Sequence, residues 1–230
     1  MRRIKNKTII TSKKLRDLAW RQGIKSSYIH KNVPYFAQWE SRELVEDIIT
    51  CKIKAEYDPR WEESGAENKA EYSLWSWNGC GMACLRMIVG TTNHKILPQV
   101  KLAKQCLEQG VYRQPLELSP GLFYKPFVAF IEKRFGWKGK AVATLTSSEI
   151  RHTLSQGGYV IASVTPEIRH PHKKPLQKGG HLVLMLGYDN NKKMFYLHNP
   201  SGFKDTQEYF KISYKDFSKF SSNKGILIYT

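Results

Sequence analysis

Cys80 is the residue of this sequence whose setting best suits nucleophilic chemistry. It lies between Gly79 and Gly81 in the segment NGCGMACLRMI, where a turn gives way to an apolar run typical of a helix. A thiolate is the reactive form of cysteine, and the free N–H groups and macrodipole of a helix N-terminus lower a thiol pKa. The two glycines leave room for a substrate carbonyl, and the Cys80 amide could face a developing oxyanion. Taken alone, a cysteine beside an apolar helix is more often a buried packing residue.

A base for this thiol is available in His181, which follows Gly179 and Gly180 and begins the most apolar predicted strand. A histidine at the start of a strand can face a helix N-terminus across a cleft. The next predicted strand ends in HNP, which places Asn199 one hairpin later. Its amide oxygen could accept the ring N–H of His181 and fix the tautomer, although an Asn-Pro pair by itself indicates a turn.

Neither a metal site nor a disulfide framework is predicted. His170 and His172 form an HxH pair in a basic loop with no cysteine or carboxylate cluster nearby, so we expect a solvated loop and no metal or other cofactor. The four cysteines show no CxxC spacing, which favours free thiols in a reducing compartment. Three of them fall on predicted helices and are expected in the core: Cys51, Cys84 and Cys106.

The elements that must position these groups divide the chain into two parts. VPYFAQ (33–38) is a short strand or an extended entry. Helical spacing and capping residues predict helices at 12–22, 41–53, from Cys80 onward, 98–109, 123–135 and 147–156. Short β-branched and aromatic runs predict strands at 159–165, 181–189, 194–200 and 225–230. Helices followed by an antiparallel sheet indicate an α+β fold.

The order of four segments, VPYFAQ, NGCGMACLRMI, GGHLVLMLGYD and YLHNP, resembles that of papain-like cysteine peptidases. In particular, it resembles the bacteriocin-processing peptidases that act on double-glycine leaders, and their stand-alone relatives. The resemblance implies a papain-like fold with Cys80 at a helix N-terminus packed on the sheet. It also implies attack of a thiolate on an amide or thioester carbonyl, a covalent acyl-enzyme, and a triad of Cys80, His181 and Asn199. Gln38 would help to form the oxyanion hole.

Two features depart from the family pattern. The third triad residue is commonly aspartate, and Asn199 would stabilise an imidazolium less. The 41 residues between Gln38 and Cys80 form a longer spacer than expected, with an acidic insertion at about 40–75. We expect this insertion to shape the cleft, with Trp77 as a substrate contact. Gly180, at the end of the basic loop before His181, is expected at the rim of the same cleft.

Chain length and net charge limit the possible domain organisation, location and partners. The 230 residues suit one domain over 32–230 after a basic extension at 1–31, and no apolar run is long enough to span a membrane. We expect a cytoplasmic protein. The formal net charge of +17 suits an acidic partner, but no nucleic-acid motif accompanies it, so nucleic acid is not expected.

Two function classes remain open after this reading. The first is a peptidase or amide hydrolase acting on a peptide, and the second is an acyltransferase. A transferase would use the same Cys80 acyl-enzyme to move an acyl group from a carrier-protein thioester to an amine. A binding module without activity is disfavoured, because the reactive set is intact.

Overall fold

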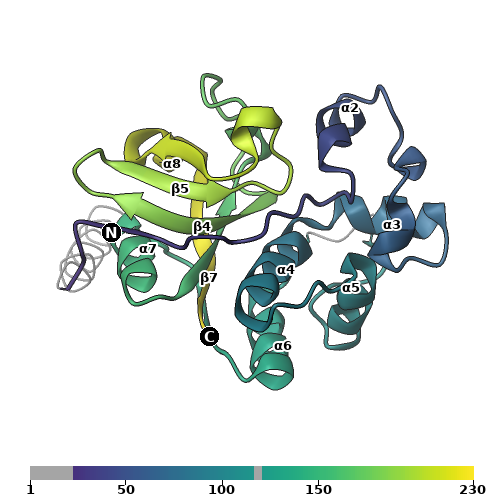
Figure 1. The fold of residues 1–230 in the computed structure, drawn as a ribbon, viewed down its shortest axis with the longest axis horizontal. Coiled ribbons are helices and arrows are strands. Elements are labelled where there is room, and N and C mark those ends of the chain that lie inside the picture. Colours follow the sequence, from purple (N-terminus) through teal and green to yellow (C-terminus); the bar gives the residue numbers. More distant parts are fainter. Residues whose placement is uncertain (1–22, 117–120) are drawn as a thin grey trace, which may run out of the picture.

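A computed structural model describes residues 23–116 and 121–230 as an α+β fold in two parts. Figure 1 shows one group of helices beside a twisted antiparallel sheet, with two further helices packed on the sheet. The helices are α2 (Val45–Ile49), α3 (Lys69–Trp77), α4 (Cys80–Asn93), α5 (Gln99–Glu108), α6 (Tyr124–Phe135), α7 (Ser147–Ser155) and α8 (Tyr214–Phe220). The strands are β1 (Ser27–Ile29), β2 (Lys138–Val142), β3 (Tyr159–Val164), β4 (His181–Asp189), β5 (Met194–His198), β6 (Phe210–Ser213) and β7 (Ser221–Tyr229).

The sheet has the strand order β2-β7-β3-β4-β5-β6, and every pairing in it is antiparallel. β1 adds to the far end of β4, where Ile29 pairs with Gly187. β3 and β4 lie in the middle of the sheet, so both are buried along their length. The start of β4 is therefore a rigid place from which to present a side chain.

Both faces of the sheet are covered, because successive residues of a strand point to opposite sides. On β3, Tyr159 and Ile161 belong to the core that includes α4, whereas Val160 and Ala162 belong to a second core shared with α7 and α8. Burying each large apolar side chain of this kind stabilises the fold by roughly 1.5–3 kcal/mol. The sheet is thus held between two independent layers.

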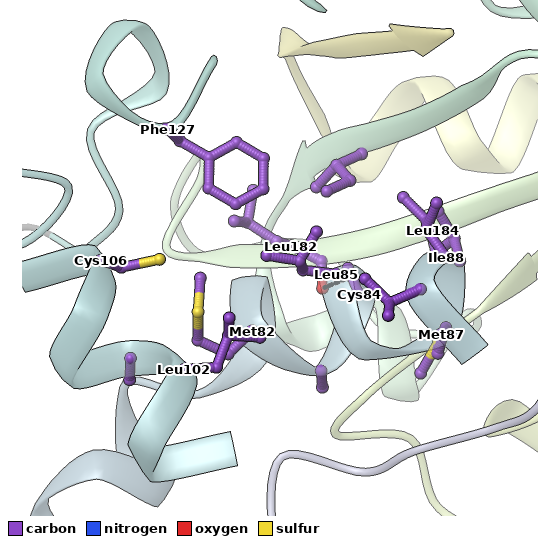
Figure 2. Close-up of a cluster of buried hydrophobic side chains, with 14 of the residues drawn as sticks. Met82, Cys84, Leu85, Met87, Ile88, Leu102, Cys106, Phe127, Leu182 and Leu184 are labelled. Atoms are coloured by element: carbon purple, nitrogen blue, oxygen red, sulfur yellow. Dashed lines mark hydrogen bonds between the residues drawn. The ribbon is translucent and has the colours of Figure 1, made fainter. Parts of the chain in front are cut away.

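Helix α4 is enclosed on all sides. Every residue from Gly81 to Val89 is buried. Figure 2 shows its side chains interleaved with those of the neighbouring elements: Met82, Leu85 and Ile88 of α4, Leu182 and Leu184 of β4, Leu102 and Cys106 of α5, and Phe127 of α6. Even Arg86 is buried, because its guanidinium forms an ion pair with Glu40 at 2.9 Å. Close packing of this kind fixes the N-terminus of the helix relative to β4.

The predicted helices at 98–109, 123–135 and 147–156, the helix from Cys80, and the four predicted strands are confirmed. VPYFAQ is extended but pairs with no strand, since single hydrogen bonds hold it instead: the Val33 N–H donates to the Tyr209 hydroxyl and the Gln38 N–H to the Pro200 carbonyl. Cys84 and Cys106 are buried as expected.

Other expectations were wrong. The helix predicted at 41–53 consists of a 3₁₀ turn (Arg42–Leu44) and α2, and it ends at Ile49. Cys51 then turns into the left-handed region with φ 60° and is exposed rather than in the core. No helix was predicted where α3 lies, and β1, β2, β6 and α8 were not predicted either. The helix predicted at 12–22 lies outside the described residues.

Candidate active site

Cys80 is the first residue of α4, directly after the short turn that ends α3. The glycines beside it are required by packing. A Cβ at Gly79 would lie 2.6 Å from the Gln99 side-chain nitrogen, and a Cβ at Gly81 would lie 2.7 Å from Leu122 Cδ1. Because neither glycine is among the described residues that line the adjoining cavity, their predicted contact with substrate remains a prediction.

A cavity of about 600 Å³ opens beside Cys80, and His181 lies on its wall. The segments that enclose it come from the end of α3, the start of α6, the loop before β4 and the start of β7. Trp77 and Gly180, both predicted at the cleft, line this cavity. Trp77 is 50% exposed and packs edge-to-face on Trp39 at 5.1 Å. The cavity is large enough for a few residues of an extended peptide.

His181 is aimed by the two glycines before it and by the sheet behind it. Gly179 and Gly180 have φ of +82° and +90°, a conformation in which any other residue would be strained, and they turn the chain into β4. The ring nitrogen Nε2 lies 2.7 Å from Asn199 Oδ1 and 3.0 Å from Ser201 Oγ. Asn199 Oδ1 also accepts the Ser201 backbone N–H at 3.2 Å, so this oxygen faces the ring. We therefore place the ring proton on Nε2, which leaves Nδ1 as the basic nitrogen.

Asn199 is completely buried after the end of β5. Its backbone N–H donates to the Gln207 carbonyl at 2.8 Å. Its own carbonyl accepts both the Tyr35 hydroxyl at 2.8 Å and the Gly202 N–H at 2.9 Å. The main chain at Asn199 is thus fixed by three separate contacts.

Gln38 lies beside the turn that leads into Cys80. Its side-chain Nε2 donates to the Ser76 carbonyl at 3.1 Å, and its backbone carbonyl accepts the side-chain N–H of Gln99 at 2.8 Å. Since a primary amide carries two N–H donors, one remains beyond the bond to Ser76. The backbone bond from Gln38 to Pro200 ties this segment to the Asn199 loop.

Burial sets the protonation of the two reactive groups. It raises the pKa of the Cys80 thiol, although backbone hydrogen bonds at Leu182, Gly81 and Cys80 and the charge of Arg169 act in the opposite direction. Burial, together with the charge of Arg169, lowers the pKa of His181 to about 3, against the opposing bond to Asn199. The expected lowering of the thiol pKa was therefore wrong in direction, because loss of solvent outweighs the helix terminus. Both shifts favour the uncharged forms, a thiol and an imidazole.

Two residues at the site escaped the sequence analysis. Ser201 touches the His181 ring, and Arg169, from the loop before β4, donates to Ser201. Ser201 follows directly on the HNP segment, which could have drawn attention to it. Arg169 is one of several basic residues in its loop and carries no distinguishing signal.

Neither metal ligation nor membrane insertion is indicated by the described segments. In them, no three side chains of His, Cys, Asp or Glu come together as a set that could hold a metal ion. Over 23–116 and 121–230, no helix combines the length and the apolar character needed to span a lipid bilayer.

Comparisons with known proteins agree with this fold. Residues 30–223 match the model of the Peptidase_C39 like family. The crystal structure of a C39-like peptidase from Bacillus anthracis superposes with a TM-score of 0.54 at 15% sequence identity, covering 90% of this chain and 98% of the other. At that identity the superposition shows a shared fold. No curated protein matches the sequence.

Proposed function

Because the chain belongs to the Peptidase_C39 like family, a family of cysteine peptidase type, we propose that it hydrolyses peptide or amide bonds through an acyl-enzyme on Cys80. The observation that carries the proposal is that Cys80 and His181 line one cavity, while Asn199 Oδ1 lies 2.7 Å from Nε2 of the His181 ring. A thiol, a base and a group that orients the base are the parts needed for nucleophilic acyl transfer.

A neutral thiol and a neutral imidazole favour general-base attack. As Cys80 Sγ forms its bond to the substrate carbonyl carbon, the thiol proton passes to His181 Nδ1 and the carbonyl oxygen becomes an oxyanion. The backbone N–H of Cys80 and the remaining Nε2 hydrogen of Gln38 are the proposed donors to that oxyanion. Collapse breaks the C–N bond, and the amine leaves with the proton from Nδ1. Water, deprotonated by His181, then releases the acid and restores Cys80.

The cavity wall suggests where a substrate would lie. Trp77 offers an exposed aromatic face, and Gly180 allows a close approach of the backbone beside His181. Lys178 and Lys224 are exposed on the same wall, and none of its described residues is acidic. This charge favours an anionic group on the substrate, and it is the observation that keeps the acyltransferase alternative, with an acidic carrier protein as acyl donor.

Intact-mass spectrometry tests the proposal. The protein is incubated with a diverse peptide mixture, quenched in acid, and compared with Cys80→Ala. New peptide termini together with an acyl adduct on Cys80, both missing from the variant, support the hydrolase. An adduct formed only from an acyl-carrier thioester and discharged by an added amine would favour the transferase. A chain that forms no Cys80 adduct from either donor class would overturn both.

A further inference from the structure

Arg169 is a half-buried cation that the proposed mechanism does not use. It is the last residue of the 3₁₀ helix Pro166–Arg169, which follows β3. The start of this helix is anchored, because the Thr165 N–H donates to the Phe220 carbonyl at 2.9 Å. Within the described residues Arg169 forms no ion pair, and its guanidinium lies 5.9 Å from the centre of the Phe203 ring. A cation taken partly out of water without a carboxylate needs another explanation.

The guanidinium of Arg169 donates hydrogen bonds to two oxygens of Ser201. Its Nε donates to the Ser201 carbonyl at 2.8 Å and to Oγ at 3.2 Å, and its Nη2 donates to Oγ at 3.0 Å. A planar fork of donors fixes both the peptide and the side-chain rotamer of its acceptor. Ser201 is therefore held in one orientation from both ends.

Ser201 in turn contacts both the candidate base, His181, and the amide of Asn199 that orients it. Its Oγ lies 3.0 Å from His181 Nε2, and its backbone N–H donates to Asn199 Oδ1 at 3.2 Å. We propose that Arg169 is a positioning residue that acts through Ser201, holding the Asn199 amide oxygen and the Ser201 hydroxyl on Nε2 so that Nδ1 stays the basic nitrogen. This inference rests on the proposed function of His181 as the base.

The nitrogen of the Asn199 side-chain amide shows why these contacts on its oxygen are needed. Asn199 Nδ2 is buried and has no hydrogen-bond partner among the described residues. Nothing on that side opposes a flip of the amide. A flipped amide would turn Nδ2 toward Nε2 as a donor and require the tautomer with its proton on Nδ1, which cannot accept a proton from Cys80. The contacts on the Oδ1 side therefore decide the tautomer.

The charge of Arg169 acts in the same direction. Of the charged groups in the described residues, Arg169 is the one that lowers the pKa of His181, and it also opposes the burial that raises the pKa of Cys80. Glu167 is the carboxylate that acts on Arg169 itself. Burial is the larger cause of the low pKa of His181, and the charge of Arg169 adds to it, so both favour the neutral form that a general base requires.

The inference is tested without a substrate, by ¹⁵N NMR of the histidine rings and by the rate of Cys80 alkylation with iodoacetamide at pH 8. The wild-type His181 ring, identified with a His181→Ala variant, should be the Nε2–H tautomer. In Arg169→Met and Ser201→Ala it should become a mixture, and alkylation should slow by about ten-fold, as removal of orienting contacts commonly does. The double variant should be no slower than the slower single, because both act through one contact.

Two further variants distinguish the hydrogen-bond geometry of Arg169 from its charge and from a general loss of stability. Arg169→Lys keeps the charge but loses the fork, so it should resemble Arg169→Met. Arg151→Met is the matched control: Arg151 also bonds a serine hydroxyl, at 3.0 Å, and a backbone carbonyl, at 3.2 Å, and lies over a tyrosine ring at 5.4 Å, away from the cavity. It should change neither the tautomer nor the alkylation rate.

The inference would be overturned if the His181 tautomer stayed unchanged in both single variants. It would also be overturned if Arg169→Lys showed the wild-type tautomer and alkylation rate, or if Arg169→Met had an effect that Ser201→Ala did not share. If Arg169→Met fails to fold, Arg169→Lys and Ser201→Ala still decide. Failure of the proposed function looks different, because wild type and His181→Ala would then be alkylated at the same rate while the tautomer is still measured.

Discussion

The start of β4 and the end of β5 each bury a histidine, and the two surroundings differ sharply. His181 is 4% exposed and His198 is fully buried. Burial lowers the pKa of both rings to about 3. Yet His181 has two oxygens on Nε2 and borders a cavity, whereas both ring nitrogens of His198 lack a hydrogen-bond partner in the described part of the chain.

The setting of His198 is that of an aromatic core residue. Tyr35 and Tyr209 pack edge-to-face on its ring at 5.5 Å and 4.7 Å. Such contacts each contribute about 0.5–1.5 kcal/mol, while an unpaired buried polar group costs about 1–3 kcal/mol. A low pKa therefore does not mark a base by itself. What distinguishes His181 is one nitrogen held by oxygens and a cavity that a substrate can enter.

The largest effect expected from this comparison is on activity. His181→Ala should lower turnover of a peptide substrate by about 10²–10⁴-fold, since it removes the proton acceptor for Cys80. His198→Phe, which keeps an aromatic ring between the two tyrosines, should stay within about two-fold. Steady-state kinetics of the two variants, with Cys80→Ala as the blank, checks this. Equal losses in both would mean that His198 is part of the machinery.

A smaller effect on activity is expected from substitution of Asn199, whose side-chain oxygen contacts His181 Nε2. Asn199→Ala should lower kcat by about 10–100-fold, because the ring loses its orientation. Asn199→Asp should retain activity and raise the pKa of His181, since a carboxylate stabilises the imidazolium. A base must be unprotonated, so the acid limb of the pH profile should move from near the wild-type pKa of about 3 toward neutral pH. An alanine variant as active as wild type would leave Asn199 as a turn residue only.

Elements with a strong apolar period were predictable, whereas elements made by tertiary pairing were not. β3 and β4 are buried at nearly every residue, and their apolar runs indicated strands. β2 has the sequence KGKAV, with lysine and glycine that seldom form strands, and its pairing with β7 makes it one. α3 did carry a signal that was missed: Asn68 caps it by accepting the Glu71 N–H, and Tyr72, Trp75 and Ser76 share its buried face.

The candidate site shows the same division. The types and order of Cys80, His181 and Asn199 are visible in the sequence, because each stands at the end of an element. The hydrogen bonds from Arg169 to Ser201 join residues that lie 32 positions apart in the sequence, so no local sequence pattern indicates them. The direction of the Cys80 pKa also depends on how deeply tertiary packing buries the thiol, which a helix terminus in the sequence cannot indicate.

The buried ring of His198, whose nitrogens have no hydrogen-bond partner among the described residues, should lower the stability of the protein at acid pH. Its folded pKa of about 3 lies below the unfolded value of about 6.5, so the unfolded chain binds one more proton between these pH values. Stability is then fully present above pH 6.5 and is lost as pH falls toward 3, at up to about 1.4 kcal/mol per pH unit for this group. His198→Phe should flatten the slope by that amount. Urea unfolding of both proteins at pH 4 to 7 measures it, and parallel curves would show that His198 is not the group responsible.

The smallest effect is expected at Tyr35, which touches both regions: its hydroxyl donates to the Asn199 carbonyl at 2.8 Å and its ring packs on His198. Tyr35→Phe removes the hydroxyl and keeps the ring. Stability should fall by about 0.5–1.5 kcal/mol, the usual worth of one hydrogen bond, at the low end because the Gly202 N–H still satisfies that carbonyl. The acid slope should not change, since the His198 environment is kept, and the Cys80 alkylation rate should stay within about three-fold. A loss of alkylation as large as the roughly ten-fold loss expected for Ser201→Ala would show that the main-chain position of Asn199 governs the His181 ring, and not the Ser201 contacts to its side chain.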